Sequence, residues 1–340
     1  MKKFLAMSLV CAFAVSSFGC GAGNNGGDAQ QTPGLESIEE KLDTSADKAE
    51  DSKEGVDETK KDAEAPGQET GGAGQESGAA DTALYEDFKK GNAKVRYRGT
   101  ADLASNIPTT QLLEVGKSYT MDEIVALIEK SDEYRDLKLS SDIIYREIDC
   151  GSDGVPELLA EASFGDEFTL FMIIKEIDGE LVMCFDQDSW SRSSIVVNAN
   201  GTIEGSGSGG AAIHVADYAF VDASGDYKYY YGCEETLTLY GDIYAYKTAE
   251  DYVVIPSEGL DNDHLGIRDY YFEADYDKRN HYYEYFVIDD NYNDVTTDAD
   301  YDDSNELKKK FTEAGIRTYT KAEMDQMLKD RAKEIGYPKP

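Results

Sequence analysis

The sequence predicts an α+β protein whose folded part is an antiparallel meander of β-hairpins, with helices at the N- and C-terminal ends of the domain. In its middle, short runs of β-branched and aromatic residues alternate with tight-turn dipeptides such as Asp178-Gly179 and Asn200-Gly201. Helical periodicity begins at two Thr-x-x-Glu capping boxes, which start at Thr120 and Thr320. Because strands joined by tight turns pair antiparallel, we expect hairpins rather than βαβ units.

The N-terminal elements of the domain are expected to be a short helix over 83–90, a strand over 94–98 and a helix from 120 to 131. Four hairpins are expected to follow the first strands, with turns at 178–179, 200–201, 223–226 and 241–242. The expected strands are 143–148, 155–162, 170–177, 181–185, 195–198, 202–204, 213–221, 227–231, 237–240 and 243–246. The expected C-terminal helices are 304–314 and 320–335.

Composition excludes two broad classes of protein. The chain has 340 residues, with 33 Lys+Arg against 69 Asp+Glu, and therefore a formal net charge of −36 at pH 7. Such a charge repels phosphate backbones, so no nucleic acid is expected as a partner. Hydrophobic residues make up 40% of the chain, which is too many for a chain that is disordered throughout.

The N-terminus has the pattern of an export signal. Two lysines precede an apolar run over 4–15, which is too short to span a bilayer. Ser17 and Gly19 then lead into Cys20, and this stretch resembles the lipobox of bacterial lipoproteins, although Ser17 stands where that box usually has Leu. The resemblance implies that 1–19 is a lipoprotein signal peptide and that Cys20 is lipidated. The protein would then be exported and anchored to the outer face of the cytoplasmic membrane, at the cell surface. The alternative is an ordinary cleaved signal with an incidental cysteine.

A long acidic segment follows the cysteine. Residues 21–82 contain no aromatic residue and have 16 acids against five lysines. Such a composition cannot bury enough apolar surface to offset chain entropy, so we expect 20–83 to be a disordered tether. The folded domain is then 84–340, whose 26 basic and 53 acidic residues give it a net charge of −27.

A loop of alternating oxygen ligands is the most specific internal motif. Asp149, Asp153 and Glu157 occupy loop positions 1, 5 and 9, Gly154 occupies position 6, and Val155 offers its carbonyl at position 7. The loop resembles the D-x-D-x-D-G-x-x-D calcium loop of FG-GAP and VCBS propeller repeats, although its third position is a glycine. The resemblance implies calcium as a cofactor, held by Asp149, Asp153, Val155 and Glu157. The alternative is a tight turn at Asp153-Gly154, with Glu157 pointing outward.

The same stretch, D-x-x-x-D-G-x-P-E-L between two strands, also resembles a module of uncharacterised surface lipoproteins of Gram-positive anaerobes. The later hairpins extend this resemblance over about 100 residues. That family implies no known activity.

A tyrosine- and acid-rich segment over 269–303 is a second candidate site. Tyrosines beside carboxylates can stack on sugars or bind cationic partners, whereas alternating tyrosines also form the half-buried face of ordinary strands. Its acidic end, 298–306, has either calcium-ligand spacing or, as we favour, a helix cap at Asp303 or Ser304.

The remaining reactive residues carry no catalytic pattern. His214, His264 and His281 lack zinc-ligand spacing. Three cysteines leave open one disulfide with one free thiol, or three free thiols: Cys150, Cys184 and Cys233.

We therefore expect a lipid-anchored extracellular binding or structural module, more a binder than an enzyme. Its ligand would be a cell-wall polymer, a carbohydrate or a protein. The alternative is a secreted glycan-acting hydrolase that uses a carboxylate pair in the tyrosine-rich region. A transporter's solute-binding protein is a third possibility, but it would need two lobes built on parallel sheets, against the hairpin pattern.

Overall fold

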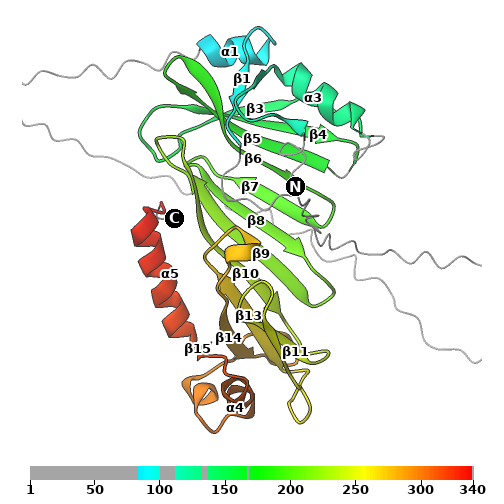
Figure 1. Cartoon of the computed structure of the whole chain (residues 1–340), viewed down its shortest axis with the longest axis vertical. Coiled ribbons are helices and arrows are strands. Elements are labelled where there is room, and N and C mark those ends of the chain that lie inside the picture. The colour runs from blue at the N-terminus through cyan, green and yellow to red at the C-terminus, as the bar shows by residue number, and fades with distance from the viewer. Residues whose placement is uncertain (1–82, 100–111, 132–136, 167, 339–340) are drawn as a thin grey trace, which may run out of the picture. The chain divides into compact units, whose positions relative to one another are not determined.

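The computed structural model describes residues 83–99, 112–131, 137–166 and 168–338, all within one compact unit (Figure 1). The predicted signal peptide, Cys20 and the tether up to residue 82 lie outside the described residues. Among the helices that the structure describes, none is long and apolar enough to cross a membrane.

Six strands form the first sheet, in the order β2-β1-β6-β5-β4-β3. All neighbouring strands are antiparallel except β1, which pairs with β6 in parallel. Two helices, α1 (Ala83–Lys89) and α3 (Met121–Lys130), cover one face of this sheet (Figure 1). The strands are β1 (Val95–Tyr97), β2 (Ser118–Tyr119), β3 (Ile144–Ile148), β4 (Glu157–Phe164), β5 (Phe168–Ile177) and β6 (Glu180–Ser189).

Seven strands form the second sheet, in the order β15-β14-β13-β10-β9-β8-β7, antiparallel except for the parallel pair β14–β15. Its strands are β7 (Ser193–Val197), β8 (Thr202–Ser208), β9 (Ile213–Val221), β10 (Tyr227–Thr236), β13 (Leu265–Tyr271), β14 (Tyr282–Val287) and β15 (Thr318–Tyr319). A separate hairpin pairs β11 (Ile243–Tyr246) with β12 (Tyr252–Ile255). The other elements are the 3₁₀ helices η1 (Tyr276–Lys278) and η2 (Asp298–Tyr301) and the helices α4 (Glu306–Glu313) and α5 (Lys321–Ile335).

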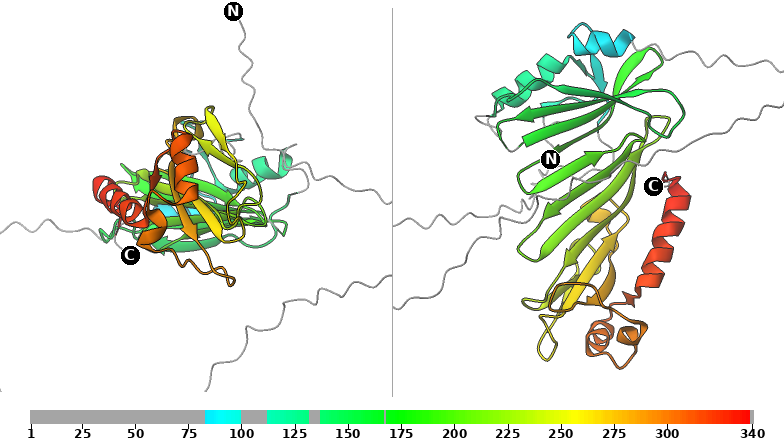
Figure 2. Two further views of the ribbon diagram at one scale, coloured as in Figure 1. Left: turned by 90° about the horizontal axis from the view of Figure 1, so that it is seen from below. Right: turned by 180° about the vertical axis from the view of Figure 1, so that it is seen from behind.

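Strand β5 explains how the two sheets share a core. Its apolar residues run almost without a break because both of its faces are covered. Leu170 and Met172 pack with the helices α1 and α3, whereas Phe171 and Ile173 pack with residues of β7–β9 in the second sheet. A third cluster lies between β13–β14, the β11–β12 hairpin and α4. Helix α5 runs alongside the second sheet and contacts β10 (Figures 1 and 2).

The predicted class is confirmed in its broad form, as a mostly antiparallel α+β fold with helices towards both ends. Helices α3 and α5 begin at the predicted capping boxes of Thr120 and Thr320. The β5–β6 turn has φ of 54° at Asp178 and 80° at Gly179, as a type I′ turn requires.

The predicted hairpin at Asn200-Gly201 is present as β7–β8 but has a different turn type, and the predicted fourth hairpin was wrong. In the β7–β8 turn only Gly201 has positive φ, and the Asn198 N–H donates to the Thr202 carbonyl at 2.8 Å, which makes a three-residue loop rather than a type I′ turn. In the predicted fourth hairpin, β11 pairs with β12 rather than with 237–240. That segment is held instead by its backbone, because the Leu237 and Leu239 N–H groups donate to carbonyls of distant loops.

Candidate binding groove

The second sheet has one face packed against the core and a second face, here called the outer face, that carries the candidate site. Strand pairing places its side chains in rows that cross β8, β9 and β10 and continue onto β13. Row by row, these residues are Glu204, Tyr218 and Tyr231; Ser206, Ala216, Cys233 and Tyr270; and Ser208, His214, Glu235 and Arg268.

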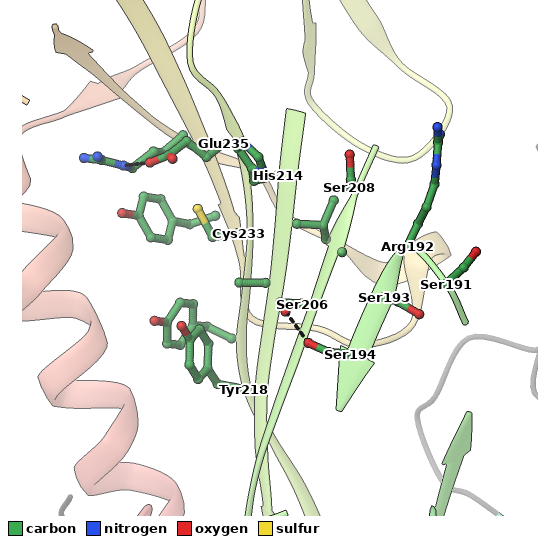
Figure 3. Close-up of a pocket in the computed structure, with 16 residues that line it drawn as sticks. Ser191, Arg192, Ser193, Ser194, Ser206, Ser208, His214, Tyr218, Cys233 and Glu235 are labelled. Carbon is green, nitrogen blue, oxygen red and sulfur yellow. Dashed lines mark hydrogen bonds and ion pairs between the residues drawn. The ribbon is translucent and has the colours of Figure 1, made fainter. Parts of the chain in front are cut away.

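A hollow of about 590 Å³ opens on this face (Figure 3). Its floor is the middle row, whose side chains are small on three neighbouring strands: Ser206, Ala216 and Cys233. Tyrosines stand along one side of this floor, and the row containing His214 and Arg268 stands along the other. The hollow therefore follows from the register, which aligns small residues between two rows of large ones.

The tyrosine side of the hollow is built around one stacked pair. Tyr218 and Tyr231 face each other across β9 and β10, with ring centroids 4.6 Å apart and an interplanar angle of 21°. Tyr270 follows at 6.2 Å from Tyr231. Burial raises the pKa of Tyr231 and Tyr270 well above the usual range, so both phenols stay protonated at physiological pH.

A second hollow, of about 710 Å³, meets the first at the stacked pair, because Tyr218 and Tyr231 line both. It continues towards the C-terminal end of α5, where Tyr230 and Tyr337 lie with ring centroids 4.3 Å apart. The Tyr230 hydroxyl donates to the Leu328 carbonyl at 3.0 Å and so ties the helix to the sheet. We call the two hollows together the tyrosine groove.

One arginine holds three carboxylates at the other side of the groove. The Arg268 guanidinium contacts Glu235 at 2.6 Å, Glu284 at 2.9 Å and Asp294 at 3.2 Å. Burial alone would lower the pKa of Arg268, but these hydrogen bonds and charges outweigh it and raise the pKa. Tyr270 also donates to Glu284, at 3.2 Å. Glu235 and Glu284 are thus a carboxylate pair beside a tyrosine, but one guanidinium binds both, whereas glycoside hydrolysis needs a free acid and a free nucleophile or base.

The predicted calcium loop folds as a turn in which two of its aspartate carboxylates accept hydrogen bonds from its own backbone N–H groups. Asp149 Oδ1 accepts from the Asp153 N–H at 2.9 Å, and Asp153 Oδ1 accepts from the Val155 N–H at 2.8 Å. Gly154 has φ of 81°, as a tight turn requires. In the part of the chain that the structure describes, no group of three or more His, Cys, Asp or Glu could hold a metal ion.

Glu157 points into the core, where it reaches the loop backbone at Cys150, and not outward as the alternative expected. Its carboxylate is fully buried, forms an ion pair with Lys175 and accepts from the Cys150 N–H at 2.6 Å. One of the four predicted calcium ligands is therefore occupied by another partner. Calcium at this loop stays a prediction.

The tyrosine-rich segment divides between core and surface. Tyr271, Tyr283 and Tyr285 are buried, which is the strand-face interpretation, while Tyr276 and Tyr292 are exposed. The segment contributes Tyr270 to the groove, and the other groove tyrosines come from β9, β10 and the C-terminus. The signal that could have found them is the run Tyr-Lys-Tyr-Tyr-Tyr over 227–231.

The acidic end of that segment caps helices, but the predicted cap residue was wrong. Asn305 is the N-cap of α4, and its Oδ1 accepts from the Leu307 and Lys308 N–H groups. Asp303 instead pairs with Lys308 at 2.8 Å. An amide at this position caps the helix as well as a carboxylate does.

The three cysteines after residue 83 are free thiols. Burial raises the pKa of Cys184 to about 11, and raises those of Cys150 and Cys233 further. Thiols of this kind are poor nucleophiles at neutral pH.

Comparisons of the chain with family models, curated proteins and solved structures found no match in any of the three.

Proposed function

We propose that this chain is a lipid-anchored protein of the bacterial cell surface that binds a ligand in the tyrosine groove. The stacked Tyr218–Tyr231 pair, set between two hollows of the outer face, carries the proposal. A hollow lined by aromatic side chains and a few polar groups has the composition of a ligand site. A row of large aromatic rings beside a row of small residues is not expected on a sheet face that meets only solvent.

Anchoring rests on the sequence before the domain. Cys20 follows an apolar signal core and small residues, and the acidic 20–83 segment then separates it from the domain. We expect the protein to fractionate with membranes and to incorporate a fatty-acid analogue in growing bacteria. The Cys20→Ala variant should lose both properties. Equal labelling of the variant and the wild type would contradict lipidation at this cysteine.

Binding is favoured over hydrolysis by the state of one carboxylate pair, of which Glu235 lines the first hollow and Glu284 lies beside it on β14. Glu235 and Glu284 share the Arg268 guanidinium, so neither is free to act on a glycosidic bond. A purely structural module would need no hollow at all, so the groove also separates binding from that alternative.

The test is a binding screen of the purified full-length protein against cell-wall polymers, polysaccharides and peptides. Tyr218→Ala should weaken binding of any ligand found by at least about tenfold, because the rings of that ligand lose the aromatic side chain on which they stack. Tyr244→Ala is the matched control, since Tyr244 is 57% exposed on the separate β11–β12 hairpin. Melting temperatures establish that both variants fold. A screen without any ligand, or equal losses in the two variants, would overturn the proposal.

A further inference from the structure

One ring face of Tyr218 has no aromatic neighbour among the described residues, and we call it the open face. Among the described residues, the ring contacts of Tyr218 involve Tyr231 alone, which covers the face towards β10. The opposite face looks towards β8, where Glu204 lies directly opposite Tyr218 and Ser206 lies one row further along, opposite Ala216. Figure 3 shows Tyr218 on the same side of the sheet as the hydroxyls of Ser194 and Ser206. The site therefore offers a flat apolar surface next to hydroxyl groups.

The floor beside this ring can both donate and accept hydrogen bonds. Ser194 and Ser206 share one hydrogen bond of 2.7 Å across β7 and β8. A hydroxyl has one donor and two acceptor positions, so the pair keeps one donor and several acceptors for a ligand. Glu204 accepts from the Asn198 amide at 3.0 Å through one oxygen and has a second oxygen available. This mixture matches a ligand that carries many hydroxyls, each of which also donates and accepts.

Charge disfavours an anionic ligand and gives little to a cationic one. Arg268 is bound to three carboxylates, so that cluster is net negative, in a domain of net charge −27. A polymer bearing phosphate or uronate groups would be repelled. An ammonium group would gain little, because Glu235 is already paired and Glu204 is already hydrogen-bonded. Arg192, before the edge strand β7, lies at the rim away from the tyrosines (Figure 3).

The two hollows extend the site on both sides of the stacked pair. Each, at about 590 and 710 Å³, lies in the range that holds a drug-sized ligand. A single small ring would fill only part of either one. A chain that passes over Tyr218 would contact both hollows, with Ser194 and Ser206 beneath it on one side and Tyr230 and Tyr337 beside it on the other.

We infer that the ligand of the tyrosine groove is an uncharged polysaccharide chain, one of whose sugar rings stacks on the open face of Tyr218. This inference rests on the proposed function and names the class of its ligand. The apolar C–H face of a sugar ring packs on the aromatic ring, and its hydroxyl rim reaches the serine pair and Glu204. The remaining sugars occupy the two hollows, so affinity increases with chain length.

Calorimetric titration of the full-length protein tests this with three kinds of probe. They are neutral oligosaccharides of glucan, mannan, galactan and xylan in a series of lengths, then polygalacturonate, then an oligolysine peptide. We expect binding of at least one neutral series, with affinity that rises from disaccharide to hexasaccharide. Tyr218→Leu should weaken it at least tenfold, while Tyr218→Phe, which keeps the ring, should stay within about threefold of wild type. Ser206→Ala should weaken it by a smaller factor of about five.

Other outcomes would distinguish failure of the polysaccharide inference from failure of the proposed binding function. If polygalacturonate or oligolysine binds and the neutral probes do not, and if Tyr218→Leu weakens that binding, the groove is a binding site but the inference is overturned. Neutral binding that is indifferent to Tyr218→Leu would place the sugar elsewhere and overturn it too. If no probe of any class binds a protein that melts cooperatively, the inference and the proposed function both fail.

Discussion

Breaking the buried ion pair between Glu157 and Lys175 should be among the most damaging single changes in the domain. The pair lies on neighbouring strands β4 and β5, and the two side chains are 0% and 10% exposed. Lys175→Met removes the ammonium but keeps a long apolar side chain. It leaves the Glu157 carboxylate in the core with the Cys150 N–H as its remaining partner.

The magnitude follows from leaving a charge buried without its counter-ion. Such changes cost about 3–5 kcal/mol, a large part of the roughly 5–15 kcal/mol that holds a domain folded. For a domain of this size, that loss lowers the melting temperature by about 6–20 °C. The double variant Glu157→Gln/Lys175→Met should cost at most about 2 kcal/mol, because it removes both charges and keeps an acceptor for the Cys150 N–H.

Urea unfolding of the full-length protein, followed by circular dichroism, measures these differences. Lys228→Met is the matched control, since Lys228 is 40% exposed and pairs with Asp222 at 2.8 Å on the surface. That change should cost no more than about 1 kcal/mol.

The pH dependence of this loss of stability is a second test of whether the Glu157 carboxylate is buried and charged. Burial raises the pKa of Glu157 even beside Lys175, and the variant lacks the cation that opposes this. A carboxyl whose pKa is higher in the folded state than in the unfolded chain costs no stability below its unfolded pKa of about 4.3. It destabilises the folded state as pH rises through the raised pKa. The deficit of Lys175→Met should therefore shrink between pH 7 and pH 4.5. A loss below 1 kcal/mol, or a deficit that does not change with pH, would refute a buried charged pair.

Three further predictions concern the glycines, one histidine and the turn of the predicted calcium loop. Gly232→Ala should destabilise the domain by about 1–3 kcal/mol in urea unfolding, since its Cβ would lie 2.1 Å from a buried tyrosine ring, whereas Gly241→Ala, with no atom within 4 Å, should be near neutral. Hydrogen bonds to Asp290 and to a second carboxylate raise the pKa of His264 above 6.5, so its contribution to stability is present below pH 6.5 and is lost as pH rises through the raised pKa. An NMR titration should show a lower His264 pKa in Asp290→Asn, and an unchanged pKa would contradict the role of these hydrogen bonds. Melting temperatures with calcium and with a chelator test the calcium prediction: a calcium-dependent rise that Asp153→Ala abolishes would establish the ion site. Equal temperatures, both lowered by Asp153→Ala through loss of its turn hydrogen bond, would contradict it.

The features that the sequence predicted well are those decided by neighbours along the chain. The capping boxes at Thr120 and Thr320 and the turn at Asp178-Gly179 each depend on a few adjacent residues, and the structure has all three. The division into two sheets could not be foreseen in the same way. It depends on β1, which leaves its neighbours in sequence and pairs in parallel with β6, about 85 residues later.

Long-range strand pairing also determines the role of Glu157, the last residue of the predicted calcium loop. The spacing of Asp149, Asp153 and Glu157 is that of a ligand set, and spacing is all that the sequence offers. Register places Lys175 of β5 opposite Glu157, because Leu158 pairs with Ile174. A buried carboxylate takes the nearest cation, so a residue 18 positions away gives Glu157 a role that the local motif cannot show.

The tyrosine groove depends on a still smaller feature of register. The pairing of β9 with β10 shifts between Tyr229 and Tyr231, so that Tyr229 lies opposite Ala219 and Tyr231 opposite Tyr218. Without this β-bulge, Tyr230 would face Tyr218 and Tyr231 would turn towards the core, because one residue of slip exchanges the two faces of a strand. The run of tyrosines in the sequence is compatible with either arrangement. The bulge therefore decides that Tyr231, and not Tyr230, lies opposite Tyr218, and that Cys233, and not Gly232, lies opposite Ala216 in the floor of the groove.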